Sequence, residues 1–155
     1  MDKIYIGIDP GSNGGIAVSD MLEGELEVIK MPPTFPDIYN TLKEKMKDGR
    51  ECVAVLEDVG QGIPGQSSAS TAKFARHIGN LEMALYALGI RTELVKPQKW
   101  MKTYSNTIGS SRGKTKGQWK NALKGEAQRL FPFEKVTMWN ADALLILEYA
   151  RRQHL

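Results

Sequence analysis

Three short strand patterns follow one another at the start of the chain, and this order limits the folds open to it. Residues 3–9 are mostly β-branched or aromatic and end at Asp9, which predicts a strand. The Gly-rich segment 10–15 predicts a turn that uses positive φ angles. Residues 16–19 and 26–29 predict two further strands. Short connections favour antiparallel pairing, so these three strands are expected to form a meander.

After the meander, the patterns alternate between helix and strand. Pro32, Pro33 and Pro36 end the meander, and Asp37 is expected to cap the first helix. The elements expected next are a helix 37–47, a strand 51–57, a helix from 70 or 71 to 88, a strand 91–95, a helical turn 97–100, a polar loop 105–113, and helices 115–130 and 140–152. This order predicts one α/β layered domain over residues 1–155, with a five-stranded mixed sheet of the meander plus parallel strands, flanked by helices.

An apolar stripe runs along the helix expected after residue 70, at Phe74, Ile78, Leu81, Leu85 and Leu88. The stripe packs either on the body of the domain or in a dimer interface. Gly79, in the middle of this helix, costs about 1 kcal/mol relative to Ala and indicates a close helix–helix approach. His77 is expected to be a surface histidine. Tyr86 and Trp100 are expected in the core or an interface.

The composition excludes several classes of protein. Cys52 is the one cysteine of the sequence, so an internal disulfide is excluded and a reducing compartment is expected. Apolar runs fall far short of the roughly 20 residues that span a bilayer, and the first residues lack the pattern of a signal peptide. We therefore expect a protein without a membrane partner, in the cytoplasm of a bacterium or of a phage-infected host.

Positive charge is concentrated in one segment. Residues 91–135 contain 11 Lys and Arg against 3 Asp and Glu, although the net charge of the whole chain is only +3. A basic segment on an acidic body is typical of a protein that binds an anionic partner such as nucleic acid. A solvated helix face is the alternative interpretation. Lys116, Lys120 and Lys124 recur every four residues and so share one helix face.

Three carboxylates occupy positions where α/β proteins place functional sites. Asp9 ends the first strand, Glu57 ends the strand expected beside it, and Asp142 opens the last helix. Sites of open α/β sheets lie at the carboxyl ends of the strands. Three converging carboxylates offer the oxygen ligands that Mg²⁺ prefers, and they would repel one another without a cation.

Three sequence motifs that contain these carboxylates resemble those of one family. Ile6–Ser12 resembles the opening motif of the RuvC family of Holliday junction resolvases, within the RNase H-like superfamily. Val55–Glu57 resembles the second acidic strand of that family, and Asn140–Ile146 its C-terminal acidic helix. The resemblance runs over roughly residues 3–152, and the short length is similar to the phage-type branch.

The resemblance implies an RNase H-like fold and a metal-dependent crossover junction endodeoxyribonuclease. Such an enzyme acts as a homodimer on branched DNA, makes paired symmetric nicks by two-metal phosphodiester hydrolysis, and leaves 5′-phosphate ends. The implied cofactor is Mg²⁺, with Mn²⁺ as a substitute. Asp9 would bridge both ions, Glu57 would bind one and Asp142 the other.

The basic segment acquires a role under the same resemblance. Either Lys116 or Lys120 matches the catalytic-site lysine that relatives place before the last helix, and the spacing leaves both open. The residues expected to contact DNA phosphates are Arg112, Lys114, Lys116, Lys120 and Lys124.

Two departures from the family pattern leave alternatives open. Asp142 has no carboxylate three or four residues away on its helix, so the fourth metal ligand is unassigned among Asn140, Asp58, Glu126 and Glu148. Residues 58–64 contain no aromatic wedge, which leaves Ile63 or a residue from elsewhere. The alternatives are a broad-specificity debranching nuclease and a junction-binding protein that does not cleave.

Overall fold

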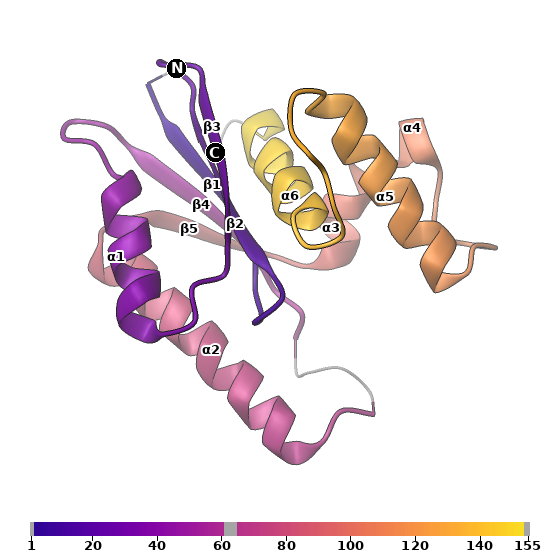
Figure 1. Cartoon of the computed structure of the whole chain (residues 1–155), viewed down its shortest axis with the longest axis horizontal. Helices are drawn as coiled ribbons and strands as arrows, with labels where there is room; N and C mark the ends of the chain where they lie inside the picture. Colours follow the sequence, from indigo (N-terminus) through magenta and orange to yellow (C-terminus); the bar gives the residue numbers. More distant parts are fainter. Residues whose placement is uncertain (1, 61–64, 154–155) are drawn as a thin grey trace.

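A mixed five-stranded sheet forms the centre of the computed structural model, which describes residues 2–60 and 65–153 (Figure 1). The strands are β1 (Ile4–Asp9), β2 (Gly15–Asp20), β3 (Glu25–Lys30), β4 (Cys52–Glu57) and β5 (Arg91–Val95). Their order in the sheet is β3-β2-β1-β4-β5. The first three pair antiparallel, whereas β4 is parallel to β1 and β5 is parallel to β4. The expected mixed α/β sheet is confirmed.

Helices cover both faces of the sheet (Figure 1). They are α1 (Phe35–Lys45), α2 (Ser68–Ala87), α3 (Pro97–Lys102), α4 (Ser105–Ile108), α5 (Lys116–Leu130) and α6 (Ala141–Arg152). One face packs against α1 and α2, and the other packs against α6, with α3 and α5 beside it. Within the described ranges, no helix is both long and apolar enough to cross a bilayer.

The alternation of side chains along β1 assigns each residue to one of two cores. Ile4, Ile6 and Ile8 are fully buried in the core that α1 and α2 complete. Tyr5 belongs to the opposite core, which α5 and α6 complete. Because side chains alternate with a period of two, Asp9 points to the same face as Tyr5, toward α6.

Gly7 allows α6 to lie directly on β1. A Cβ atom at this position would sit 2.4 Å from the backbone nitrogen of Leu147 and 2.7 Å from the carbonyl oxygen of Ala143. No side chain fits such a gap, so glycine is required by this close approach of two backbones. The contact places the first turn of α6 beside the end of β1.

Several predicted boundaries were wrong by a few residues. Thr34, not Asp37, caps α1: its Oγ1 accepts a hydrogen bond from the backbone N–H of Asp37 at 3.2 Å. Pro36 fits in the first turn because the N–H it lacks is unpaired there. Ser67 caps α2 in the same way, ahead of the expected start at 70 or 71.

The segment expected to be a polar loop, 105–113, begins with the short helix α4. Ile108 at the end of α4 packs against the core that includes α5 and α6, and this tertiary contact outweighs the polar local sequence. Helix α5 begins where expected, with Thr115 and Gln118 forming a capping box.

Helix α2 packs on the domain through its predicted stripe, since Leu81 and Leu85 are fully buried against the sheet. The expected close approach at Gly79 is wrong within this chain, because a Cβ there would meet nothing within 4 Å. Gly79 instead lies on an exposed face of α2 that also carries Met83 and Tyr86, which are 61% and 80% exposed.

Candidate active site

The structure brings Asp9, Glu57 and Asp142 to one end of the sheet. Ile8 of β1 pairs with Leu56 of the parallel strand β4, so the next residues, Asp9 and Glu57, end neighbouring strands side by side. Both point to the face that α6 covers, and Asp142 lies in the first turn of α6. Each carboxylate is at least partly buried.

Burial and mutual repulsion raise the pKa values of these carboxyl groups above their usual range. Loss of solvation is the largest of the effects that raise the pKa of Asp9 to about 8, and the negative charges of Asp142 and Glu57 contribute to the same rise. Burial also raises the pKa of Asp142. Such shifts arise where anionic groups are gathered away from water, which is typical of functional sites.

Trp100 holds Glu57 in place. The indole Nε1–H of this fully buried residue donates a 2.7 Å hydrogen bond to Glu57 Oε2. The pKa of Glu57 is raised to about 7, mainly by burial, although the Trp100 hydrogen bond opposes the rise because it stabilises the carboxylate. Sequence reasoning placed Trp100 in the core or an interface but missed this role, since only the fold brings α3 to the end of β4.

Lys120 is the cation that faces the acidic group. Its charge lowers the pKa values of both Asp9 and Asp142, against the larger effect of burial. Lys116 lies one turn earlier on α5 and is not among the charges that shift these two pKa values. The sequence left both lysines open, and the electrostatic effect of Lys120 on the two carboxyl groups favours that residue.

The four residues considered as a further ligand all have other partners. Asn140 Oδ1 accepts from the backbone N–H of Thr137 at 2.8 Å, and its Nδ2 donates to the carbonyl of Lys135. The remaining three carboxylates have the following partners: Asp58 accepts from the Gly60 N–H, Glu126 pairs with Arg129, and Glu148 pairs with Arg151 and Arg152. The hydrogen bonds and ion pairs of these four side chains are thus made with residues other than Asp9. Ile63, the suggested wedge, lies outside the described residues.

The other lysines and Arg112 occupy different surroundings. Lys114 Nζ donates to the carbonyls of Ile108 and Ser110 and lies 5.6 Å from the Trp119 ring, so it braces the loop before α5. Arg112 and Lys116 are exposed, and Lys124 is half-buried on α5. Lys116, Lys120 and Lys124 share one face of α5, as the spacing predicted.

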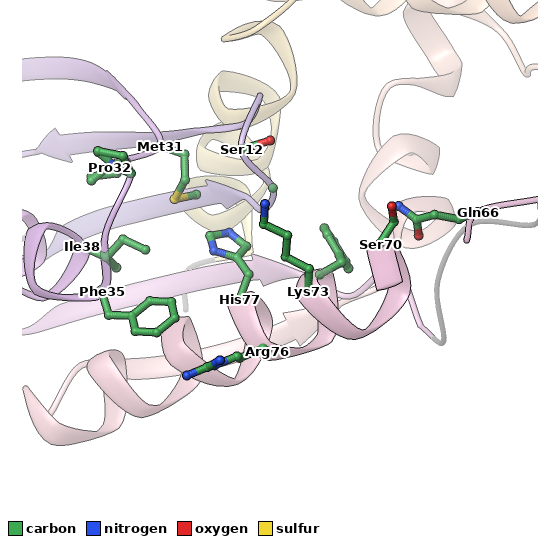
Figure 2. A pocket seen from close by; sticks show the side chains of 13 residues that line it. Ser12, Met31, Pro32, Phe35, Ile38, Gln66, Ser70, Lys73, Arg76 and His77 are labelled. Atoms are coloured by element: carbon green, nitrogen blue, oxygen red, sulfur yellow. The ribbon is translucent and has the colours of Figure 1, made fainter. Parts of the chain in front are cut away.

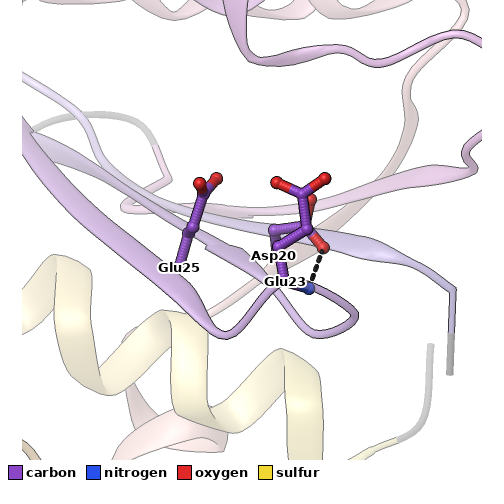
Figure 3. Close-up of side chains that lie close together, drawn as sticks. All are labelled: Asp20, Glu23 and Glu25. Atoms are coloured by element: carbon purple, nitrogen blue, oxygen red, sulfur yellow. Dashed lines mark hydrogen bonds between the residues drawn. The ribbon is translucent and has the colours of Figure 1, made fainter.

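A second acidic group lies at the opposite end of the sheet. Among the described residues, the carboxylate oxygens that come within 4.8 Å of one another are those of Asp20, Glu23 and Glu25 (Figure 3). Asp20 pairs with Ile4, at the start of β1, so it lies about 16 Å from Asp9 along the strands. Lys47 Nζ contacts all three carboxylates at 2.5–3.1 Å, and Arg50 also binds Asp20. Two cations thus already pair with the three carboxylates of this group.

The chemistry of the Asp9 group fits a divalent cation. Among the described residues, Lys120 is the one cation that lowers the pKa values of Asp9 and Asp142, whereas two cations contact the three carboxylates of the Asp20 group. All the donors are oxygens, which suit Mg²⁺ and Mn²⁺. The three are spaced more widely than the Asp20 group, as expected for carboxylates that repel one another. Asp9 is close enough to both other carboxylates for each of their charges to raise its pKa.

The raised pKa values predict a pH effect on stability. Folding raises the pKa of Asp9 from 3.8 to about 8, so the folded state binds the proton more tightly than the unfolded state. The tighter proton binding contributes to the unfolding free energy. This contribution is fully present below about pH 4 and is lost as the pH rises toward 8. We expect the unfolding free energy of the metal-free protein to fall over this range relative to Asp9→Asn.

Urea denaturation at several pH values measures this difference. Comparison with Asp9→Asn is needed because Asp20 acts in the opposite sense: its hydrogen bond from Arg50 lowers its pKa, so its contribution is lost only in acid. A difference between the two proteins that does not change with pH would show that Asp9 is not buried as described.

Comparison with known proteins reveals a shared fold. The sequence matches no protein-family profile, and no curated protein matches it significantly. Among solved structures, Thermus thermophilus RuvC matches with a TM-score of 0.60 over 97% of this chain and 96% of that chain, at 16% identity. The chain has a RuvC-like fold.

Two further structures show the same likeness. T. thermophilus RuvC in complex with a Holliday junction substrate gives a TM-score of 0.61 at 18% identity, with the same coverage. The yeast mitochondrial Holliday junction resolvase Ydc2 gives 0.52 at 16% identity, over 99% of this chain and 81% of that chain. The RuvC-like fold thus extends over nearly the whole chain described here.

Proposed function

We propose that this protein is a metal-dependent endonuclease that cuts branched DNA and resolves Holliday junctions by paired symmetric nicks. The observation that carries the proposal is the convergence of Asp9, Glu57 and Asp142, with Lys120, at the carboxyl ends of β1 and β4. The RuvC-like fold supports it, because one protein of that fold was solved on a Holliday junction. Residues 1–155 would form one nuclease domain that serves DNA recombination or repair in the cytoplasm.

Each residue of the site has a defined task in this proposal. Asp9, Glu57 and Asp142 would hold Mg²⁺ or Mn²⁺, which when bound lowers the pKa of water and stabilises charge on the phosphate. Trp100 fixes the Glu57 carboxylate, so that it does not reorient when DNA binds. The Lys120 ammonium lies beside the carboxylates, where it can donate to the oxygens of the phosphate being cut.

The lysines of α5 provide the next test. Lys120→Gln is expected to lower the cleavage rate at saturating DNA by about 100-fold, the usual effect of losing one donor to a transition-state oxygen. Lys116→Gln should change the saturated rate little. It should instead weaken junction binding. The slope of log K for binding against log salt concentration should become about 0.9 less steep, since one phosphate contact is lost. Equal effects of the two variants would contradict the assignment of Lys120.

The homodimer expected for such an enzyme has a candidate interface on α2. Ala75, Gly79, Met83 and Tyr86 are exposed and share one face of that helix. We expect Met83→Glu to raise the dissociation constant of the dimer at least about tenfold, as loss of an interface anchor does. Sedimentation equilibrium measures it, with Asn40→Glu on α1 as the control. A dimer that tolerates Met83→Glu would place the interface elsewhere.

Cleavage assays separate the proposed activity from its alternatives. An end-labelled four-way junction, a fork and a linear duplex of matched sequence are incubated with the protein in Mg²⁺. Symmetric nicks in the junction alone support a resolvase. Equal cutting of forks and junctions would indicate a broad debranching nuclease. Tight binding without cutting in Mg²⁺ or Mn²⁺ would indicate a junction-binding protein in which none of Asn140, Asp58, Glu126 and Glu148 acts as a fourth ligand.

A further inference from the structure

A cavity of about 640 Å³ lies on the α1–α2 side of the sheet, away from the carboxylates (Figure 2). It opens between the turn after β1, the segment that follows β3, and the first half of α2. Its volume is within the 300–1,000 Å³ range of pockets that bind small ligands. Met31, Ile38 and Phe74 give it an apolar wall. The catalytic proposal above assigns no task to this cavity.

The lining of the cavity also includes polar and positively charged side chains. Lys73 and Arg76 line it, together with the hydroxyl groups of Ser12 and Ser70. In Figure 2 the Lys73 side chain rises from α2 toward Ser12. The Arg76 guanidinium lies 5.4 Å from the centre of the Phe35 ring, so it adds charge to an aromatic wall. Apolar surface beside fixed cations suits a ligand with a flat apolar part and an anionic part.

His77 supplies an unpaired polar atom at this cavity. It was expected on the surface, but its ring is half-buried and rises from α2 toward Met31 (Figure 2). Its Nε2 atom is buried without a hydrogen-bond partner in the part of the chain that is described. Burial lowers the pKa of His77, so the imidazole is neutral near pH 7. A buried polar atom without a partner is costly, and a ligand that hydrogen-bonds to it removes that cost.

Two residues that line the cavity are close in sequence to Asp9, although the cavity lies on the other face of the sheet. Gly11 and Ser12 line it, and they follow Asp9 by two and three residues. At about 3.8 Å between consecutive Cα atoms, Ser12 lies within about 11 Å of Asp9. A DNA strand that runs from the carboxylates around the end of the sheet would reach Ser12, at the edge of the cavity, within two or three nucleotides. This placement argues for a ligand that belongs to the same DNA.

We propose that the cavity holds one unpaired nucleotide of the branched DNA substrate. This inference rests on the proposed nuclease function. The base would lie against Met31 and Phe74 with its edge at His77 Nε2, and its phosphate would lie at Lys73. Duplex DNA keeps its bases stacked and paired, whereas recognition of a single base requires that it leave the stack. The cavity would thus favour DNA with unpaired nucleotides near the branch point over a linear duplex.

NMR of the histidine side chains tests this proposal directly. The sequence has two histidines, His77 and His154, so comparison with His77→Gln assigns the two imidazole signals. The full-length protein is titrated in EDTA with single-stranded (dT)₄, and with an abasic tetramer that has the same phosphates. The expected result is a shift of the His77 signal with (dT)₄ and none with the abasic strand. Equal shifts would overturn a base site in favour of an anion site, and no shift would exclude both.

Variants with matched controls separate this site from the nuclease function. Lys73→Gln is expected to weaken (dT)₄ binding at least about fivefold, whereas Lys43→Gln, exposed on α1 outside the cavity, should not. Lys73 is itself exposed, so the variant should fold. Junction cleavage with no His77 shift and no Lys73 effect would refute the cavity proposal alone. The converse, a His77 shift in a protein that cuts no DNA, would refute the nuclease function alone.

Discussion

Asp9→Asn is expected to lower the rate of junction cleavage in Mg²⁺ by at least about 100-fold. Asparagine keeps the shape of the side chain but removes the charge that would hold a cation between Glu57 and Asp142. Charge stabilisation by such a cation contributes several kcal/mol to phosphodiester hydrolysis, and each 1.36 kcal/mol corresponds to about a tenfold change in rate. Single-turnover cleavage of a labelled four-way junction at saturating protein measures this effect.

DNA binding provides the control for the same variant. Asp9 faces the DNA phosphates with negative charge, so its neutralisation should leave junction affinity unchanged or raise it. The metal-free variant should also be at least as stable as the wild-type protein at pH 8, because a raised pKa marks Asp9 as costly to ionise. Cleavage by Asp9→Asn at the wild-type rate would show that the chemistry occurs elsewhere.

Gly7→Ala is expected to destabilise the fold by about 3 kcal/mol or more, which corresponds to a fall in Tm of about 6–12 °C. The added Cβ would meet the backbone of α6 at 2.4–2.7 Å, and a backbone cannot turn aside as a side chain can. Helix α6 would have to move away from β1 and take Asp142 with it. Thermal unfolding followed by circular dichroism measures the loss.

Gly125→Ala is the matched control for Gly7→Ala. Gly125 lies in α5, where a Cβ would meet nothing within 4 Å. Alanine there should stabilise the protein by about 1 kcal/mol, since it is the better helix former. If Gly7→Ala were tolerated as well as Gly125→Ala, the close packing of α6 on β1 would be incorrect.

Local patterns were sufficient to predict the elements that position the carboxylates. The β-branched run before Asp9 and the apolar run before Glu57 both form strands, and these strands end at Asp9 and Glu57 as expected. The connection between these strands contains β2, β3 and α1, and their parallel pairing brings the two carboxyl ends together. The first-turn position of Asp142 in α6 also followed from local sequence.

Features that depend on distant contacts were not predictable in this way. The hydrogen bond from Trp100 to Glu57 joins residues 43 positions apart, and nothing in the local sequence of α3 indicates it. The burial of His77 depends on the segment that carries Met31, which comes from another element. The Asp20 group resembles a metal site until Lys47 and Arg50, from beyond α1, are placed against it.

Titration of the metal-free protein with Mn²⁺ by isothermal calorimetry is the most direct test of where a cation binds. The comparison uses wild-type protein, Asp9→Asn, and Glu25→Gln from the acidic group at the other end of the sheet, which pairs with Lys47 and Arg50. Wild type and Glu25→Gln are expected to bind Mn²⁺ with equal affinity, and Asp9→Asn at least about tenfold more weakly, because it loses one of three charged ligands. Retention of binding in Asp9→Asn with loss in Glu25→Gln would contradict a metal site at Asp9, Glu57 and Asp142.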